Sequence, residues 1–259
     1  MVKQPVPLDA VGKTVLTVPT KNGELDHNIA LARIGFLQKG ANVIDFASYS
    51  EFMESKHSVP GMLLLSSVSL VRQAVLDILK IDLPSIDYPE SIFPYLQRDI
   101  KVETVEDVLK YVNQGQPIFA KPVKQKLFRG QVFEDIASLV ALAPFADDVP
   151  VYTSKPVKFV SEWRTYVVDD EIRRFCFYRG TPHITPDFSD AYAVAQTLQN
   201  TGESTRSYSI DLGVDTEGET HLIEINDGFS LGNYGLPTDE YAHLILTRWQ
   251  KLYEDTGHI

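Results

Sequence analysis

The 259-residue sequence contains one cysteine, Cys176, and a surplus of acidic residues that gives it a formal net charge of -11 at pH 7. A single cysteine excludes a disulfide framework and a cysteine-based zinc site. Because Cys176 lies between Phe175 and Phe177, we interpret it as a small buried residue rather than a nucleophile. The negative charge argues against a general nucleic-acid surface, although a local basic channel for phosphates is compatible with it.

Long apolar runs are also missing. The most apolar short segment, residues 61–65, is far too brief to cross a membrane, and residues 1–13 lack the apolar centre of a signal peptide. We therefore expect a cytoplasmic protein without a membrane partner. The length allows one large domain or two smaller ones.

The first part of the chain alternates between strand and helix patterns. Strands are predicted at residues 13–18, 42–46 and 62–65, and helices at 28–38 and 70–79. This order predicts a small α/β domain with a parallel sheet. Gly12-Lys13-Thr14 looks like the end of a phosphate-binding P-loop, but that motif needs a glycine at position 7, where the chain has Pro7.

A proline-containing linker at residues 83–94 is followed by a basic segment. Thr104 is a suitable N-cap for a helix at 105–113, and the strand at 117–122 ends on Lys121. The next loop adds Lys124, Lys126 and Arg129 beside a glycine. Such cations can close over a polyphosphate, whereas a single lysine at a strand end is also typical of a surface side chain. A helix is predicted at 133–142.

A hairpin formed by strands at 156–168 and 172–178 carries charged side chains. Glu162 and Arg164 share one strand face. They form either an ion pair, which contributes about 0–1 kcal/mol when exposed, or contacts to a sugar and a phosphate. Arg173, Arg174 and Arg179 make the second strand basic, which indicates either an anion contact or a solvated strand.

A second hairpin at residues 207–226 carries oxygen ligands. Asp211 lies on its first strand. Alternation places three residues on one face of the second strand, with Ile223 and Ile225 facing the core: Leu222, Glu224 and Asn226. Asp, Glu and Asn offer the hard oxygen ligands that Mg²⁺ prefers beside phosphates, although charged faces also occur on solvated hairpins. The glycine-rich loop at 227–235 has the composition of a ligand-binding loop. Amphipathic helices are predicted at 188–200 and 239–253.

Taken together, these segments resemble the ATP-grasp superfamily. The pattern comprises a strand ending in Lys121-Pro122, a basic loop, a hinge strand, Glu162-Trp163-Arg164, an aspartate and then Glu224-x-Asn226. The closest similarity is to a reduced clade of bacterial and phage members. It implies an α/β (α+β ATP-grasp) fold: an N-terminal parallel α/β domain at 1–85, then an ATP-grasp domain at 86–259. The latter divides into a smaller lid-like subdomain at 86–155 and a metal and substrate subdomain at 156–259, which hold ATP between antiparallel sheets.

The resemblance also implies roles for individual residues. Lys121 and Arg164 would be the catalytic cations on the phosphates. The ATP-binding residues would further include Lys126, Tyr152, Ser154, Val157 and Glu162. The ligands of Mg²⁺ would be Asp211, Glu224 and Asn226. Contacts to the substrate would come from Arg173, Arg179, Asp227, Tyr234 and Gly235. Three positions depart from the family pattern: Lys155 replaces an acidic hinge residue, Ser209 replaces an arginine, and only Arg98 or Lys101 can stand for an earlier phosphate lysine.

We therefore expect an ATP-dependent ligase that joins a carboxylate to an amine through an acyl-phosphate. Its substrate would be a small molecule or peptide, with an amino acid or a peptide as the candidates. Two alternatives use the same pocket: an ATP-dependent phosphotransferase acting on a hydroxyl, and a non-catalytic nucleotide-binding protein. The sequence does not indicate an oligomeric state.

Overall fold

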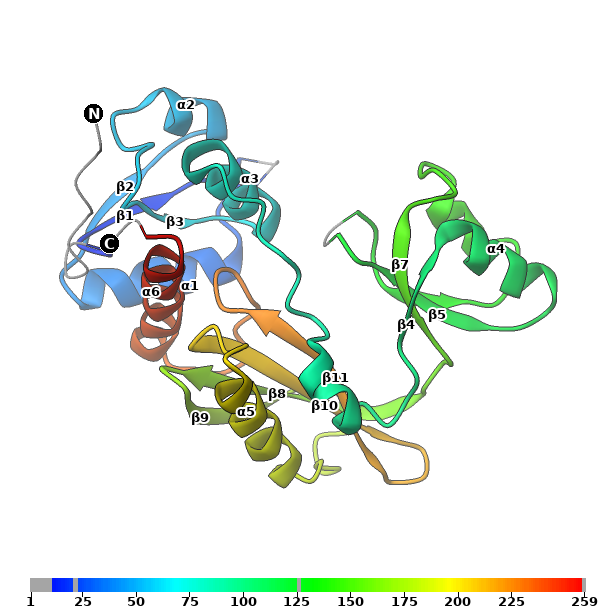
Figure 1. Ribbon diagram of the computed structural model, residues 1–259. Coiled ribbons are helices and arrows are strands. Elements are labelled where there is room, and N and C mark those ends of the chain that lie inside the picture. Colours follow the sequence, from blue (N-terminus) through cyan, green and yellow to red (C-terminus); the bar gives the residue numbers. More distant parts are fainter. Residues whose placement is uncertain (1–10, 21–22, 125–126, 258–259) are drawn as a thin grey trace.

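The computed structural model describes residues 11–20, 23–124 and 127–257, in which three β-sheets carry the helices (Figure 1). The N-terminal sheet is parallel, with the order β2-β1-β3. Its strands are β1 (Thr14–Thr17), β2 (Asn42–Asp45) and β3 (Leu63–Leu65). Its helices are α1 (His27–Gln38), α2 (Tyr49–Glu54) and α3 (Val68–Leu79). The parallel α/β prediction is therefore confirmed, and only the short α2 was not anticipated.

The small lobe is built on an antiparallel sheet with the order β4-β7-β5-β6. The strands are β4 (Lys101–Thr104), β5 (Ile118–Pro122), β6 (Gln131–Phe133) and β7 (Pro150–Ser154). The helix α4 (Val105–Asn113) begins at the predicted cap, where Thr104 and Asp107 form a reciprocal capping box. Two short 3-10 helices are η2 (Glu90–Tyr95), which follows the linker, and η3 (Ser138–Leu142).

The helix predicted at residues 133–142 is wrong. Phe133 is the buried last residue of β6 and pairs with Ile118. Beyond it, the Ser138 hydroxyl accepts hydrogen bonds from the backbone N–H groups of Glu134 and Asp135, and the Asp135 carboxylate accepts one from the Ser138 N–H. These local bonds compete with α-helical ones, and only the 3-10 turn η3 follows.

The large sheet is antiparallel, with the order β11-β10-β8-β9. Its strands are β8 (Phe159–Val168), β9 (Glu171–Gly180), β10 (Ser207–Asp215) and β11 (Thr220–Asp227). Its helices are α5 (Ser189–Thr201) and α6 (Thr238–Asp255). α6 packs on α1, where a Cβ on Gly35 would lie 1.9 Å from the Thr238 carbonyl oxygen. Glycine permits this close approach of the two helices.

A β-bulge in β11 changes which side chains face the site. Asp211 pairs with Glu224 and Leu212 pairs with Leu222, so Ile223 is the extra residue on β11. As a result, Leu222 is buried in the core together with Ile225, while Ile223 lines a cavity beside Glu224. The prediction that Leu222 shares the face of Glu224, with Ile223 turned toward the core, is therefore wrong.

Three hydrophobic clusters divide the described residues differently from the three sheets. The largest cluster joins the N-terminal strands and helices to residues of β8, β9 and α6, including Tyr166 and Trp249. A second lies between the large sheet, α5 and η2, and the third belongs to the small lobe alone. Figure 1 shows this lobe set apart from the rest of the molecule. The boundaries at 85/86 and 155/156 remain predictions.

Candidate active site

A cavity of about 700 Å³ lies where the small lobe meets the large sheet, α3 and the loop after β11. The small lobe contributes Lys121 from β5, and the large sheet contributes Arg164 from β8, Asp211 from β10 and Glu224 from β11. Residues that are more than a hundred positions apart in the chain are thus brought to one space. Each of the two lobes supplies charged side chains to it.

Lys121 is held by two carboxylates. Its Nζ lies 2.6 Å from Glu224 Oε2 and 2.5 Å from Asp87 Oδ2, and 5.2 Å from the centre of the Tyr88 ring. Burial alone would lower the pKa of Lys121, but the neighbouring carboxylates outweigh it and the pKa is raised. Burial pushes the pKa of Glu224 upward, and the stronger influence of the Lys121 ammonium brings it below its ordinary value. Both groups are therefore charged at neutral pH.

Arg164 and Asp211 form a second buried pair. Arg164 Nε donates to Asp211 Oδ1 at 2.8 Å and Nη2 donates to Oδ2 at 2.7 Å, which is the bidentate arrangement that favours arginine. Asn226 Nδ2 donates to the same Oδ2 at 3.0 Å. Complete burial raises the pKa of Asp211, against the opposing charge of Arg164. Burial would lower the pKa of Arg164, but Asp211 raises it further, so the guanidinium stays charged.

The three predicted metal ligands are therefore adjacent: Asp211 pairs with Glu224 in register and bonds to Asn226. Among the described residues, no three His, Cys, Asp or Glu side chains gather as a metal cluster, because the third predicted ligand is an amide. Two carboxylates and an amide oxygen fit Mg²⁺ that also binds phosphates and water. Both carboxylates are bonded to cations, so a metal would take the place of Lys121 and Arg164 on them.

Glu162 and Arg164 both line the cavity, but they do not pair with each other. The Glu162 carboxylate accepts a hydrogen bond from the Tyr178 hydroxyl at 2.8 Å and lies 3.2 Å from Arg179 Nη1. The interpretation as a mutual ion pair is thus wrong. Tyr178 was not anticipated. Its ring stacks on that of Tyr234 at 5.0 Å, and Arg164 lies over both rings.

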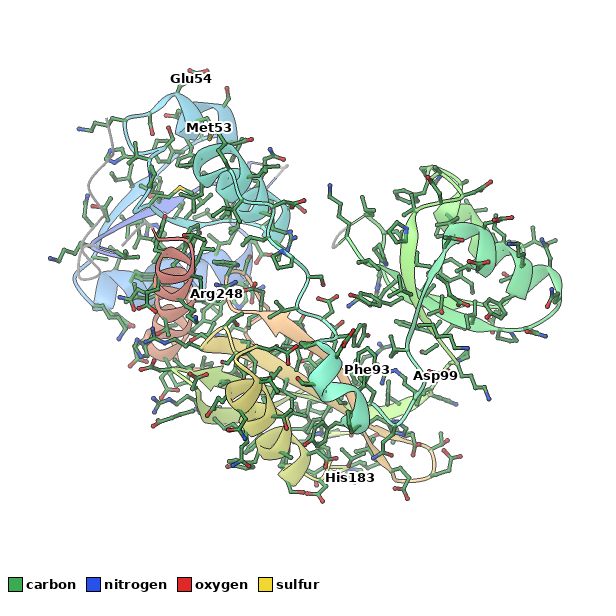
Figure 2. All side chains as sticks on the ribbon, in the orientation of Figure 1. Met53, Glu54, Phe93, Asp99, His183 and Arg248 are labelled. Carbon is green, nitrogen blue, oxygen red and sulfur yellow. The ribbon has the colours of Figure 1, made fainter. Side chains whose placement is uncertain are left out.

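The predicted substrate residues separate into two groups. Asp227 and Tyr234 line the cavity. Arg248 extends from α6 and binds the Asp227 carboxylate through two hydrogen bonds of 2.7 and 3.0 Å (Figure 2). Gly235 and Arg179 lie beside the cavity, the latter largely exposed. Arg173 is not brought to the site: it pairs with Glu171 at 3.0 Å and lines a separate small cavity beside α6.

The predicted hinge residues lie near the cavity without lining it. Tyr152 packs edge-on against Tyr88 with ring centres 4.9 Å apart, Ser154 is buried, and Val157 follows β7 in the connection to β8. Lys126 lies outside the described residues. Arg98, a candidate for the earlier phosphate lysine, instead donates hydrogen bonds of 2.6 Å to the carbonyl oxygens of Leu222 and Ile223, where it holds the bulge.

Comparison with known proteins agrees with this architecture. An antiparallel lobe facing a second antiparallel sheet across a cavity of paired lysine, arginine and carboxylate side chains defines an ATP-grasp protein. A family model described as an ATP-grasp domain, the second family of its clade, matches residues 95–244. Because this match covers more than half of the 259 residues, the chain belongs to that family.

Solved structures show the same fold at low sequence identity. D-alanine–D-alanine ligase from Bacillus anthracis matches with a TM-score of 0.55 and 12% identity over 93% of this chain and 98% of that one. The same ligase complexed with ATP matches with a TM-score of 0.55 and 14% identity over the same shares. N5-carboxyaminoimidazole synthetase from Staphylococcus aureus, complexed with ADP, has a TM-score of 0.51 and 10% identity over 91% of this chain and 76% of that one. No curated protein matches the chain.

These findings confirm the predicted fold and superfamily, and the chain is an enzyme with the ATP-grasp ligase fold. They also confirm ATP and Mg²⁺ as the cofactors that enzymes of this kind use. No helix in the described part of the chain is long and apolar enough to span a membrane.

Proposed function

We propose that the protein is an ATP-dependent ligase that joins a carboxylate to an amine through an acyl-phosphate. One observation carries the proposal: two buried cation–carboxylate pairs, Lys121–Glu224 and Arg164–Asp211, face the same cavity between the two sheets. A buried pair costs more free energy in desolvation than a surface pair does. Such pairs are therefore informative when they occur together at a cavity that opens between two lobes.

The pairs are arranged so that ligand binding can exchange partners without leaving a charge alone. When nucleotide phosphates enter, the Lys121 ammonium and the Arg164 guanidinium can bind them, while Glu224 and Asp211 turn to the metal. Each buried charge then exchanges one partner of opposite sign for another, which avoids an uncompensated buried ion. Mg²⁺, when bound, neutralises charge on the phosphoryl group being transferred. Lys121 and Arg164 would position and stabilise that group with fixed positive charge.

The nucleotide would extend from this point toward the hinge. Glu162 has one carboxylate oxygen oriented by the Tyr178 hydroxyl, which prepares the carboxylate to accept hydrogen bonds from ribose hydroxyls. Tyr152, Ser154 and Val157 lie on the β7 side, where the family pattern places the adenine. The shared position of Glu162 and Arg164 on one face of β8 then sets the direction of the nucleotide along the cavity.

The far wall of the cavity offers a binding place for the substrate. Arg72 on α3 lines it and donates hydrogen bonds to the carbonyl oxygens of Leu83 and Pro84. Among the described residues it forms no ion pair, in contrast to Lys121 and Arg164. Apolar side chains lie on the same wall, including those of Val71 and Phe229. This combination favours a substrate with a carboxylate beside an apolar group, as in an amino acid or a peptide.

Isotope transfer tests the proposal. The protein is incubated with ATP, Mg²⁺ and amino acids or dipeptides labelled with ¹⁸O in the carboxylate, and both ADP and the phosphate are analysed. An acyl-phosphate passes one carboxylate oxygen to phosphate when the amine attacks, so one ¹⁸O per phosphate is expected. Unlabelled phosphorylated product on a hydroxyl would indicate a phosphotransferase instead. ATP binding without ADP formation under any acceptor would indicate a non-catalytic protein.

A further inference from the structure

Asp87 lies in the linker between α3 and η2 and contacts both sides of the cavity. Its carboxylate is 2% exposed and lies 2.5 Å from Lys121 Nζ on the small lobe. Its backbone carbonyl accepts a hydrogen bond of 3.1 Å from the Ile225 N–H of β11, next to Glu224. The following residue, Tyr88, packs on Tyr152 and lies under the Lys121 ammonium. The linker is therefore fixed at this point.

Two carboxylates thus share one ammonium. Glu224 is a candidate metal ligand and must leave Lys121 when a metal binds. Asp87 lies on the linker, and its backbone is held to β11 independently of its side chain. We propose that Asp87 is a positioning residue: it is the permanent counter-ion of Lys121, and it frees Glu224 for a divalent cation. This inference rests on the proposed nucleotide and metal site and adds a residue to it.

The charges of the cluster give the proposal a distinctive consequence. Lys121, Asp87 and Glu224 together carry one net negative charge, which favours a cation and disfavours an anion. In Asp87→Asn, Glu224 becomes the only carboxylate on Lys121. A metal must then break that pair, while nucleotide phosphates meet a less negative site. Loss of one charge at this range changes an interaction by more than about tenfold at an effective dielectric constant of 20. Solvent and salt reduce that change.

The first experiment measures both affinities in Asp87→Asn. A non-hydrolysable ATP analogue is titrated in EDTA, and Mg²⁺ is then titrated into the protein–analogue complex. We expect metal-free analogue affinity to rise about threefold and the half-saturating Mg²⁺ concentration to rise about tenfold, allowing for that screening. Asp45→Asn, which removes one carboxylate from a surface pair with Arg33, should change neither. A variant in which both affinities fall would overturn the inference, because it would show structural damage alone.

The second experiment needs no nucleotide. Thermal unfolding is measured for Asp87→Asn alone and in a Lys121→Met background, which forms a double-mutant cycle. We expect Asp87→Asn to lower Tm in the unmodified protein. In the Lys121→Met background it should raise Tm or leave it unchanged, because the carboxylate has then lost its ammonium partner. Additive effects would overturn the inference. If the unmodified protein binds no nucleotide, the proposed function fails, and this cycle still decides whether Asp87 acts through Lys121.

Discussion

The Arg164–Asp211 pair offers a quantitative test of the site's electrostatics. Its side chains are 8% and 2% exposed, and two hydrogen bonds join them. Removing one partner of such a pair leaves a buried charge uncompensated, which costs about 3–5 kcal/mol. We therefore expect Arg164→Met to lower the free energy of unfolding by that amount, which is a large share of the roughly 5–15 kcal/mol that is typical of a domain.

Urea denaturation of the single and double variants provides the measurement. Asp211→Asn removes the charge that Arg164→Met leaves behind, so the double variant should be more stable than the sum of the two single effects predicts. We expect a coupling energy of about 2–3 kcal/mol between the two positions, which is at the upper end for neighbouring residues. The transitions should keep the same denaturant dependence if unfolding remains two-state in character.

The chain contains a matched control in the Arg33–Asp45 pair. It has the same bidentate geometry, with hydrogen bonds of 3.0 and 2.7 Å, but its side chains are 31% and 50% exposed. Exposed pairs contribute about 0–1 kcal/mol, so Arg33→Met should change stability by no more than that. Equal effects at the two pairs would refute the reasoning, because they would show that burial does not determine the cost.

Three other variants test separate parts of the account. Glu224→Gln should abolish ATP turnover, measured as ADP release, while the unfolding transition persists, because it removes a charged ligand without changing side-chain shape. Gly35→Ala should lower the free energy of unfolding by about 1–3 kcal/mol in urea, because its Cβ would meet the Thr238 carbonyl oxygen. Burial lowers the pKa of His243; the unfolded chain therefore binds the proton first, and Tm should fall as pH drops through the ordinary histidine range. His243→Gln should weaken that dependence.

Each of these expectations has a contradictory outcome. Near-normal turnover in Glu224→Gln would remove Glu224 from the metal site, and Glu217→Gln, in an exposed turn, serves as the charge control. Glycine to alanine inside a helix ordinarily stabilises by about 0.5–1 kcal/mol, so a more stable Gly35→Ala would contradict the α1–α6 packing. A pH profile that is altered equally by His27→Gln, at an exposed position, would disprove the role of His243.

Much of the site was predictable because it follows local patterns. Lys121 ends a strand of apolar residues, and Glu224 and Asn226 alternate along β11. The period of two then places these side chains on one face before any tertiary contact is known. Thr104 likewise caps α4 as its residue type predicts. The association with Arg164 and Asp211 came from the order of motifs that the ATP-grasp family shares, rather than from periodicity.

The features that sequence reasoning missed depend on contacts between distant segments. Asp87 lies in a proline-containing linker and meets Lys121 only through the packing of two lobes. The bulge at Ile223 breaks the alternation, and two hydrogen bonds from Arg98 hold it. No local pattern signals an extra residue in a strand. The stack of Tyr178 on Tyr234 depends on how the loop after β11 folds back over β9.

The most direct test of the account is the stability of the protein with a non-hydrolysable ATP analogue and Mg²⁺. A ligand that binds only the native state, at a hundred times its dissociation constant, adds about 2.7 kcal/mol to the free energy of unfolding. We predict a rise of this size that requires Mg²⁺ in full and is lost in Lys121→Met. An unchanged unfolding transition with analogue and Mg²⁺ at millimolar concentration would contradict the assignment of the cavity as a nucleotide site.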